Sequence, residues 1–284
     1  MKRIACIILN YNDAHNVMKL LSSVKDFGCF STVVIVDNCS TDNDYDLLAG
    51  FCSNKVKLIR SERNGGYGYG NNLGLKYAFN DCGCDYAVIA NPDVSFSESL
   101  IIDFLETFKD DASLGLISAV QIDKRGDKVI KSAWRLPTKK QYILSNSVLL
   151  SKLTKSFFFT KEELFNEKLK YVGCVAGSLL CLDKDTFLLT GGYDEKVFLY
   201  CEETILGFRM ASIGKRSAIL TDNYYHHIHG ATISKTFKQA RMRRKLLNSS
   251  HKYVLKNYLK ANRFERAIDS IFCFFQYALS FFRK

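Results

Sequence analysis

A mostly parallel α/β sheet flanked by helices is the fold class that the sequence predicts, on three observations. Short aliphatic runs alternate with helical segments through the first third of the chain, which is typical of strand–helix–strand units. Each run is continuously apolar, as in parallel strands that are buried on both faces. Each run also ends in a polar or glycine-rich segment, and such ends meet at the sheet edge where open α/β sheets bind their ligands.

The strands and the first helix can be assigned from residue patterns. Strands are expected at residues 4–9, 33–36, 56–59 and 87–90. After the first strand, Asp13 is expected to cap a helix. The buried face of that helix carries Val17, Leu20, Leu21 and Val24. The first apolar run is too short for a signal sequence and is not followed by a cleavage site of small residues, so it is interpreted as a strand.

The strand at residues 87–90 ends abruptly in Asn91, Pro92 and Asp93. Proline cannot donate to a sheet ladder, and it biases the preceding residue toward an extended conformation, so the strand has to stop there. Asp93 is therefore expected at the carboxyl end of a central strand, where a ligand can meet it. The alternative is that Asp93 only opens the turn before a helix that starts near Ser97.

A glycine-rich loop at residues 64–74 follows the third expected strand. It is not a dinucleotide-binding fingerprint, because Asn71 stands where the third glycine would be and because that fingerprint follows the first strand. Glycines such as Gly66 still allow the backbone to approach a ligand closely. The alternative is a flexible turn without a ligand.

Later segments add further candidates. Residues 124–170 are less periodic and are expected to form an insertion over the site, and residues 171–182 one further strand. A helix is expected to begin near Glu202, where Glu202 and Glu203 meet the positive end of the helix dipole. The alternative is that these two acids serve only as helix-terminal charges. Residues 224–230 hold three of the five histidines, which suggests a metal ligand or a phosphate contact.

The net charge of +11 is concentrated near the C-terminus. Residues 235–284 hold thirteen of the 40 basic and two of the 29 acidic residues, so residues 1–234 hold 27 of each and are neutral. We therefore expect a larger domain over 1–234 and a basic, aromatic helical region over 235–284 that meets an anionic partner. The ten cysteines lack CxxC or zinc-site spacing and are expected to be reduced.

The C-terminal region is expected to have two parts. Residues 238–260 are predicted to form a basic helix, and residues 268–282 are aromatic and apolar. The apolar part is shorter than the roughly 20 residues that span a bilayer, so we expect a helix that lies in the membrane interface. The alternative is that its apolar side chains pack on the larger domain or on a second subunit. These side chains are Ile271, Phe274, Phe275 and Phe282.

Six motifs, in this order, carry a resemblance to a known family. They are ILNYN at 8–12, VDNCSTD at 36–42, NGGYGYGNNLG at 64–74, NPDV at 91–94, GGYDEKVFLYCEE at 191–203 with Arg209 after it, and the histidine cluster. Over residues 3–234 the chain resembles the family 2 glycosyltransferases of the GT-A (nucleotide-diphospho-sugar transferase) fold. Within the family it looks most like the bacterial rhamnosyltransferase and galactofuranosyltransferase-like branch of cell-surface polysaccharide synthesis. The resemblance implies that residues 1–234 are the GT-A catalytic domain.

The resemblance also implies roles for individual residues. Tyr11 and Asp37 should lie against the pyrimidine base and ribose of a nucleoside-diphosphate sugar. The other implied donor-binding residues are Asn10, Asn64, Gly66, Asn71, Asn91 and Asp93. Asp93 matches the last acid of the family's DxD metal motif, and His227 its late metal-binding histidine, with His226 and His229 as alternatives. Glu203, which follows Glu202, stands where the family has its catalytic aspartate.

The expected reaction is an inverting sugar transfer. It needs a base for the acceptor hydroxyl, here Glu203, and a divalent ion on the departing diphosphate, Mg2+ or Mn2+. The favoured version moves rhamnose from a dTDP- or UDP-linked donor to a saccharide or a polyprenyl-diphosphate-linked acceptor, as in O-antigen or capsule synthesis. The alternatives are a UDP-sugar transferase for galactose, galactofuranose, N-acetylglucosamine or glucose, and a non-catalytic membrane-associated adaptor with a degenerate nucleotide site.

The same resemblance and the basic C-terminal region suggest where the protein works. We expect a cytoplasmic protein that is peripheral at the inner face of the cell membrane, bound there through residues 235–284. No nucleic-acid partner is expected, and a homodimer stays open.

Overall fold

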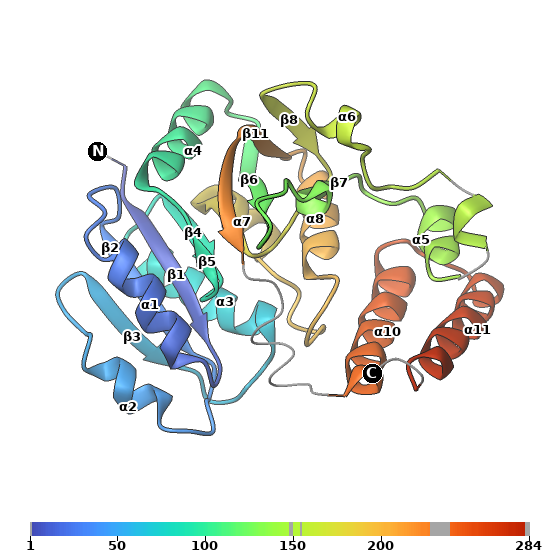
Figure 1. Cartoon of the computed structure of the whole chain (residues 1–284), viewed down its shortest axis with the longest axis horizontal. Coiled ribbons are helices and arrows are strands. Elements are labelled where there is room, and N and C mark those ends of the chain that lie inside the picture. Colours follow the sequence, from blue (N-terminus) through green and yellow to red (C-terminus); the bar gives the residue numbers. More distant parts are fainter. Residues whose placement is uncertain (1, 148–149, 154, 228–238, 282–284) are drawn as a thin grey trace.

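A nine-stranded sheet forms the centre of the computed structural model, which describes residues 2–147, 150–153, 155–227 and 239–281 (Figure 1). From edge to edge the strands are β3 (Val56–Arg60), β2 (Thr32–Asp37), β1 (Ile4–Asn10), β4 (Tyr86–Ala90), β10 (Leu179–Asp183), β6 (Leu114–Ile122), β11 (Arg216–His227) and β5 (Val94–Ser95), with β8 (Leu169–Val172) also on β11. β3, β2, β1 and β4 are parallel, β10 is antiparallel to both its neighbours, and β11 is parallel to β6. The predicted α/β fold with a mostly parallel sheet is confirmed.

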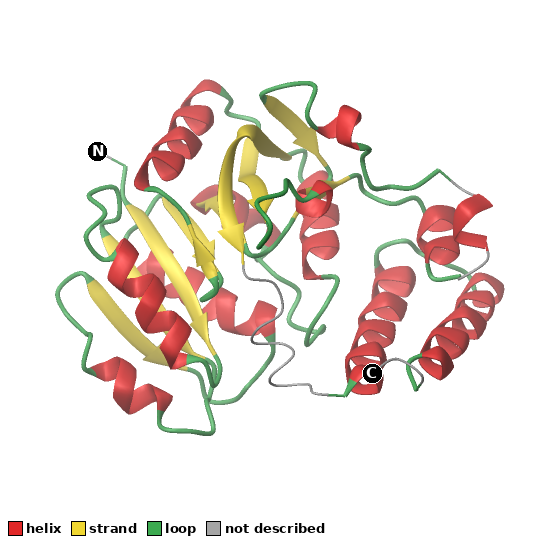
Figure 2. Ribbon diagram, in the orientation of Figure 1, coloured by secondary structure: helices red, strands yellow, loops and turns green. Residues whose placement is uncertain are grey.

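Helices cover both faces of the sheet, because neighbouring strand residues alternate between two cores (Figure 2). In β2, Val33 and Ile35 belong to the first core, and Val34 and Val36 to the second. The first core is closed by α1 (Ala14–Val24), α2 (Asp44–Ala49) and α4 (Glu98–Asp110). The second is closed by α3 (Tyr67–Lys76), the π-helical turn η1 (Tyr77–Asp81), α7 (Lys184–Thr190) and α8 (Glu202–Ser212).

The segment between β6 and β10 carries short elements beside α8. They are η2 (Ile130–Ser132), β7 (Ala133–Trp134), α5 (Lys139–Ser145), η3 (Leu150–Leu153), α6 (Lys161–Leu164) and β9 (Cys174–Val175), and β7 pairs with β9. The indole Nε1 of Trp134 donates to Thr204 Oγ1 at 3.4 Å. Because Thr204 lies in the first turn of α8, the expected insertion borders the N-terminus of that helix.

The C-terminal region is a pair of helices, α10 (Ala240–Asn257) and α11 (Arg263–Leu279). They share a third core with α5, α8 and the segment before α8. The buried members of this core are Tyr142, Ile143, Val197, Ile205, Val254, Leu255 and Ala261. The expected boundary between residues 234 and 235 lies outside the described residues. Nowhere in the described chain is a helix both long and apolar enough to cross a membrane.

The chain departs from the expected strands in two ways, by the division of one strand and by strands that were not expected. Residues 171–182 do not form one strand but contribute to β8, β9 and β10. The break lies at Gly173, whose N–H donates to Trp134 O at 3.0 Å and so turns the chain toward β7. A side chain at Gly173 would collide with the backbone of Leu136. The sequence analysis also missed β6 and β11, although β6 is buried along its whole length.

The expected helix starts are found where the sequence placed them. Ser97 caps α4, with its hydroxyl accepting from Leu100 N at 3.3 Å. α10 lies within the predicted basic helix, and α8 begins at Glu202. Asp13 occupies the N-cap of α1, but among the described residues its carboxylate makes no capping bond to the helix backbone and instead accepts from Asn16 Nδ2 at 3.0 Å.

Candidate active site

Asn10 and Asp37 end the neighbouring strands β1 and β2, where they pair in register. Both side chains are fully buried. Asn10 Nδ2 donates to Asp37 Oδ1 at 3.1 Å, to Ser40 Oγ at 3.1 Å and to Asp44 Oδ2 at 2.9 Å. The second carboxylate oxygen of Asp37 lies 3.5 Å from Arg60 Nε, at the end of β3. The Asn10 amide therefore joins the loops that follow β1 and β2.

The two residues expected at the base and ribose differ in their accessibility. Tyr11 is half-buried at the sheet edge, whereas Asp37 is enclosed by protein donors. Arg60, which the sequence analysis missed, has a side chain that is 49 % exposed beside Asp37. Asp37 therefore orders the loop that follows β2, and the charged group exposed to solvent beside it is the guanidinium of Arg60.

Residues 64–74 do not form a loop throughout, contrary to the expectation, because α3 begins at Tyr67. The remaining loop, residues 64–66, is packed against the segment that precedes α8. Asn38 Nδ2 donates to Asn64 Oδ1 and to Gly66 O, each at 3.1 Å. Gly66 has a φ of +93°, and a side chain there would collide with the carbonyl of Phe198. Asn71 is fully buried and donates from Nδ2 to Tyr67 O at 3.0 Å. Gly66 is therefore required for the close approach of two protein segments.

Asp93 and His227 meet at the end of the sheet. β11 pairs antiparallel with β5, which sets His227 opposite Val94. His227 Nε2 then lies 3.2 Å from Asp93 Oδ1, and both side chains are largely buried. His226, the preceding residue of the strand, is exposed on the opposite face. His229 lies outside the described residues.

Asp93 and His227 have the chemistry to hold a divalent ion. No group of three or more histidine, cysteine, aspartate or glutamate residues arranged for a metal occurs among the described residues. Mg2+ is commonly bound through one or two carboxylates and completed by substrate phosphates and water. Mn2+ also accepts an imidazole ligand, so the Asp93–His227 pair suits Mn2+ when a diphosphate supplies the other oxygens, whereas Mg2+ would use only the carboxylate of the pair.

A chain of hydrogen bonds connects Asn91, near Asp93, with Glu203 on α8. Tyr67 OH donates to Asn91 Oδ1 at 3.2 Å and to Gly177 O at 2.6 Å. The N–H of Gly177 donates to Glu203 Oε1 at 3.3 Å. Asn91 N in turn donates to Ser178 O at 2.8 Å. The end of β4 and the start of α8 are thus held together through Tyr67 and the turn before β10.

The two glutamates at the start of α8 have altered acidities. Burial raises the pKa of Glu202 to about 8, with the nearby charge of Glu203 as the second cause. Burial likewise raises the pKa of Glu203, while the N–H groups of Glu203 itself and Gly177 act in the opposite direction. Glu202 Oε1 is buried without a hydrogen-bond partner among the described residues. The N–H groups of Glu202 itself and of Tyr200 also act against the rise at Glu202, but burial outweighs them. Because Glu203 Oε1 accepts from the Gly177 N–H while Glu202 Oε1 has no such partner, a proton held by this pair favours Glu202.

The structure gathers most of the residues expected at the site along the carboxyl edge of the parallel strands. Asn91, Asp93, His227 and Glu203 form one connected group. Asn10, Asp37, Asn64 and Gly66 order the loops beside it, and Asn71 bonds within α3. Tyr67 and Gly177 were missed by the sequence analysis. Tyr67 lies within the glycine-rich motif at 64–74 and Gly177 within the expected strand at 171–182, so a hydroxyl or a glycine N–H in such a segment is the signal to look for.

Comparison with known proteins shows the family to which the chain belongs. The pattern of the family described as Glycosyl transferase family 2 matches residues 5–184. Rhamnosyltransferase WbbL of Escherichia coli K12 is 23 % identical over 274 residues, which cover 94 % of this chain and 98 % of that protein. The N-acetylglucosaminyl-diphospho-decaprenol L-rhamnosyltransferase of Mycobacterium tuberculosis is 27 % identical over 192 residues, 64 % of this chain and 62 % of the relative.

Solved structures share the fold at low sequence identity. GalNAc-T7 with UDP, GalNAc and Mn2+ superposes with a TM-score of 0.59 and 15 % identity, over 81 % of this chain and 44 % of that one. The Pyrobaculum calidifontis mannosyltransferase PcManGT, in complex with GDP-Man and Mn2+, gives a TM-score of 0.57 and 13 % identity, over 95 % and 73 % of the two chains. The fold is therefore the GT-A fold.

Proposed function

The chain belongs to glycosyl transferase family 2, and from this premise we propose that it is an inverting rhamnosyltransferase. Its donor is a pyrimidine nucleoside-diphosphate sugar, dTDP- or UDP-linked, and its acceptor a hydroxyl of a saccharide or of a polyprenyl-diphosphate-linked saccharide. The product belongs to a cell-surface polysaccharide. Two of the similar proteins are named rhamnosyltransferases, which supports this choice of sugar.

The observation that carries the proposal is the meeting of an acid–histidine pair and a glutamate pair at one sheet edge. Asp93 and His227 lie 3.2 Å apart at the ends of β4 and β11. Glu203 is tied to the same edge through Gly177 and Tyr67. A sugar transfer needs these two kinds of group, one for the departing diphosphate and one for the attacking hydroxyl.

In the proposed mechanism, Glu203 removes the proton of the acceptor hydroxyl as that oxygen attacks the anomeric carbon. A base has to be ionised before it acts, and the N–H of Gly177 favours the ionised form of Glu203. Glu202, whose pKa burial raises, keeps its proton and so avoids a second negative charge beside the base. With the proton on Glu202 and the negative charge on Glu203, the buried pair provides a single ionised base.

Asp93 and His227 are proposed to hold the divalent ion. Bound there with the donor diphosphate, Mg2+ or Mn2+ would act as a Lewis acid for the leaving group. Tyr67 keeps Asn91, two residues from Asp93, in place, and so orders the turn that carries the carboxylate. The bound Mn2+ named for two solved structures of this fold supports a divalent ion.

The C-terminal helices are proposed to bring the enzyme to an anionic membrane surface, at the inner face of the cell membrane. Ile271, Phe274 and Phe275 on α11 are 55 %, 66 % and 57 % exposed. The alternative that they pack on the larger domain is therefore wrong for these three; Phe282 lies outside the described residues. Exposed lysines on α10 add positive charge to this region, and a basic, aromatic surface suits anionic lipid headgroups. A lipid-linked acceptor would be met at this surface.

The test is a donor panel read by two methods. Thermal unfolding is measured with dTDP, UDP and GDP, each with and without Mn2+, and transfer is measured with the corresponding sugar nucleotides. We expect a pyrimidine diphosphate to raise the melting temperature more when Mn2+ is present. If the enzyme transfers a different sugar from a dTDP- or UDP-linked donor, that sugar would take the place of rhamnose in the proposed function. A purine preference, or neither binding nor transfer, would overturn the proposal and favour a non-catalytic adaptor.

A further inference from the structure

The segment that leads into α8, residues 191–201, ends in an unusual backbone. Tyr200 and Cys201 both have positive φ, +73° and +67°, although neither is glycine. Such conformations persist where the surrounding structure holds them in place. They stand directly before Glu202 and Glu203, so whatever holds this segment also sets where the glutamates lie.

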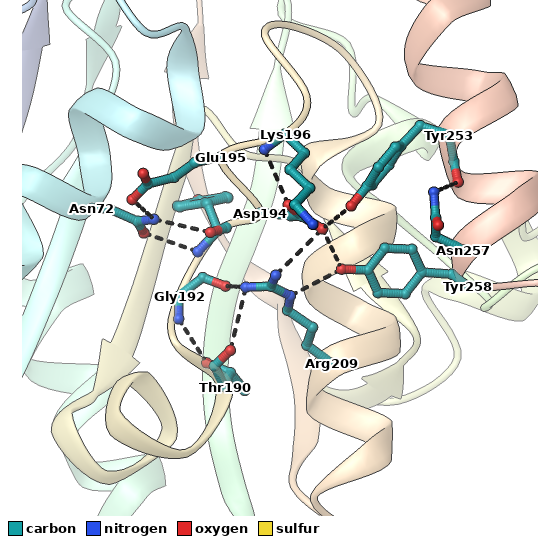
Figure 3. A network of polar contacts seen from close by, with 11 residues as sticks. Asn72, Thr190, Gly192, Asp194, Glu195, Lys196, Arg209, Tyr253, Asn257 and Tyr258 are labelled. Atoms are coloured by element: carbon teal, nitrogen blue, oxygen red, sulfur yellow. Dashed lines mark hydrogen bonds and ion pairs between the residues drawn. The ribbon is translucent and has the colours of Figure 1, made fainter.

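α10 of the C-terminal region supplies part of that support through Asp194. Tyr253 OH donates to Asp194 Oδ2 at 2.9 Å, and Tyr258 OH donates to the same oxygen at 2.6 Å. Arg209 Nη2 on α8 lies 3.3 Å from that oxygen. Figure 3 shows the Asp194 carboxylate between the two tyrosines and the guanidinium. One buried carboxylate therefore joins α10, α8 and the segment between α7 and α8.

Two further contacts extend the support along the segment. Ser250 Oγ, also on α10, donates to Leu199 O at 2.7 Å, one residue before the positive-φ pair. On the other side, the side chain of Asn72 on α3 donates to Tyr193 O and accepts from Tyr193 N, both at 2.9 Å. The segment therefore lies between α3, which begins in the glycine-rich loop, and α10, which belongs to the C-terminal region.

The charge states of these groups suit a permanent contact. Burial works to raise the pKa of Asp194, but the hydrogen bonds from Tyr258, Lys196 N and Tyr253, together with Arg209, outweigh it and leave that pKa below its usual range. Burial, and then the bond to Asp194, raises the pKa of Tyr253 and of Tyr258 to about 12. At neutral pH the tyrosines are donors and Asp194 is a charged acceptor.

We propose that Tyr253 and Tyr258 are positioning residues for the transfer reaction: through Asp194 they hold residues 191–201 and thereby the place of Glu203 beside Gly177. This inference rests on the proposed function for its catalytic consequence. It gives the C-terminal helices a role within the active site that is separate from any contact with lipid.

The test uses the full-length double variant Tyr253→Phe/Tyr258→Phe, with Tyr171→Phe as a matched control. Tyr171 OH donates to Asp111 Oδ2 at 2.9 Å, and Asp111 also pairs with Arg216 at 2.7 Å. The control thus removes a tyrosine–aspartate bond from a similar cluster, at the opposite end of β11 from His227. If the double variant fails to fold, Tyr253→Phe alone gives the same comparison with the Tyr258 bond intact.

Hydrogen exchange of residues 191–201 is the first readout, because it needs no substrate. We expect about tenfold faster exchange in the double variant and no change in the control. In transfer assays we expect kcat to fall about tenfold or more with the donor KM within about twofold, since misplacing a reacting group by about 1 Å can cost 100-fold.

Failure of this inference can be distinguished from failure of the proposed function. Unchanged exchange would overturn the inference even if the enzyme is active, and so would faster exchange with an unaltered kcat. If the wild type transfers no sugar, the proposed function fails and with it the catalytic role of the tyrosines, whereas the exchange comparison still decides whether α10 holds the segment.

Discussion

Asp93 Oδ1 and His227 Nε2 lie 3.2 Å apart, which joins the turn after β4 to the last described residue of β11. Neighbouring residues of β11 point to opposite sides of the strand, so His226 is exposed while His227 is buried against Asp93. The NPDV motif and the histidine cluster, which are far apart in the sequence, therefore each contribute one residue to a candidate metal site.

His227→Ala should abolish the extra stabilisation that Mn2+ adds to a bound nucleoside diphosphate, because it removes one of the two proposed metal ligands. We expect the metal-dependent rise in melting temperature to disappear and the metal-independent part to remain. His226→Ala is the control and should behave as the wild type. An equal loss in both variants would argue against the Asp93–His227 pair as the site.

Glu203→Gln should lower kcat by at least about 100-fold, because an amide cannot take the proton of the acceptor hydroxyl. Nucleoside-diphosphate affinity, measured by calorimetry, should change by less than about threefold, since glutamine keeps the acceptor oxygen that faces Gly177 N. Normal turnover in this variant would remove Glu203 from the mechanism.

Glu202→Gln should flatten the pH dependence of stability. The folded protein holds a proton on Glu202 up to about pH 8, whereas the unfolded chain releases it near pH 4.5, so the free energy of unfolding falls as pH rises between these values. One proton contributes at most about 1.4 kcal/mol per pH unit to that slope. Urea unfolding from pH 5 to 8 would measure it.

Glu106→Gln, on the exposed side of α4, is the control for Glu202→Gln. Its unfolding free energy should follow that of the wild type across the same pH range. An unaltered slope in Glu202→Gln would mean that Glu202 is ionised in the folded protein, contrary to the role given to it here.

The double variant Phe274→Ser/Phe275→Ser should bind anionic liposomes at least about tenfold more weakly. The substitutions remove two exposed phenyl rings, and with them the favourable free energy of transferring those rings from water into lipid. Leu188→Ser/Leu189→Ser on α7 is the control, since those side chains are 58 % and 64 % exposed outside the C-terminal region. Flotation would measure both. Equal liposome binding by the two variants would contradict a lipid contact of α11. It would favour the alternative that the exposed side chains of α11 pack on a second subunit.

Gly66→Ala should destabilise the protein more than Gly126→Ala. Both glycines have positive φ, +93° and +85°, so each substitution strains the backbone. The cost at Gly66 is on the order of 1–3 kcal/mol, because its ψ of −176° places it in a region that essentially only glycine adopts. At Gly66 the new methyl group would also meet the carbonyl of Phe198, whereas at Gly126 it enters open space. We expect an additional loss of about 1–3 kcal/mol for Gly66→Ala, measured by denaturant unfolding. Equal losses would contradict the packing of the loop against residues 191–201.

The sequence was most informative where structure is local. Continuous apolar runs placed β1 to β4 within a residue or two, because a strand that is buried on both faces is apolar at neighbouring positions. It failed where pairing partners are distant. β8, β9 and β10 were merged into one strand, since only the contact of Gly173 with Trp134 and Leu136 breaks the run.

By itself the sequence determined the fold class, the edge of the sheet that carries the polar loops, and the membership of a glycosyltransferase family through its ordered motifs. Only the tertiary structure decided that His227 rather than His226 faces Asp93, that Tyr67 connects Asn91 with Gly177, and that α10 binds Asp194. These are contacts between residues far apart in the chain. They depend on strand register and helix packing, which no local pattern of residues specifies.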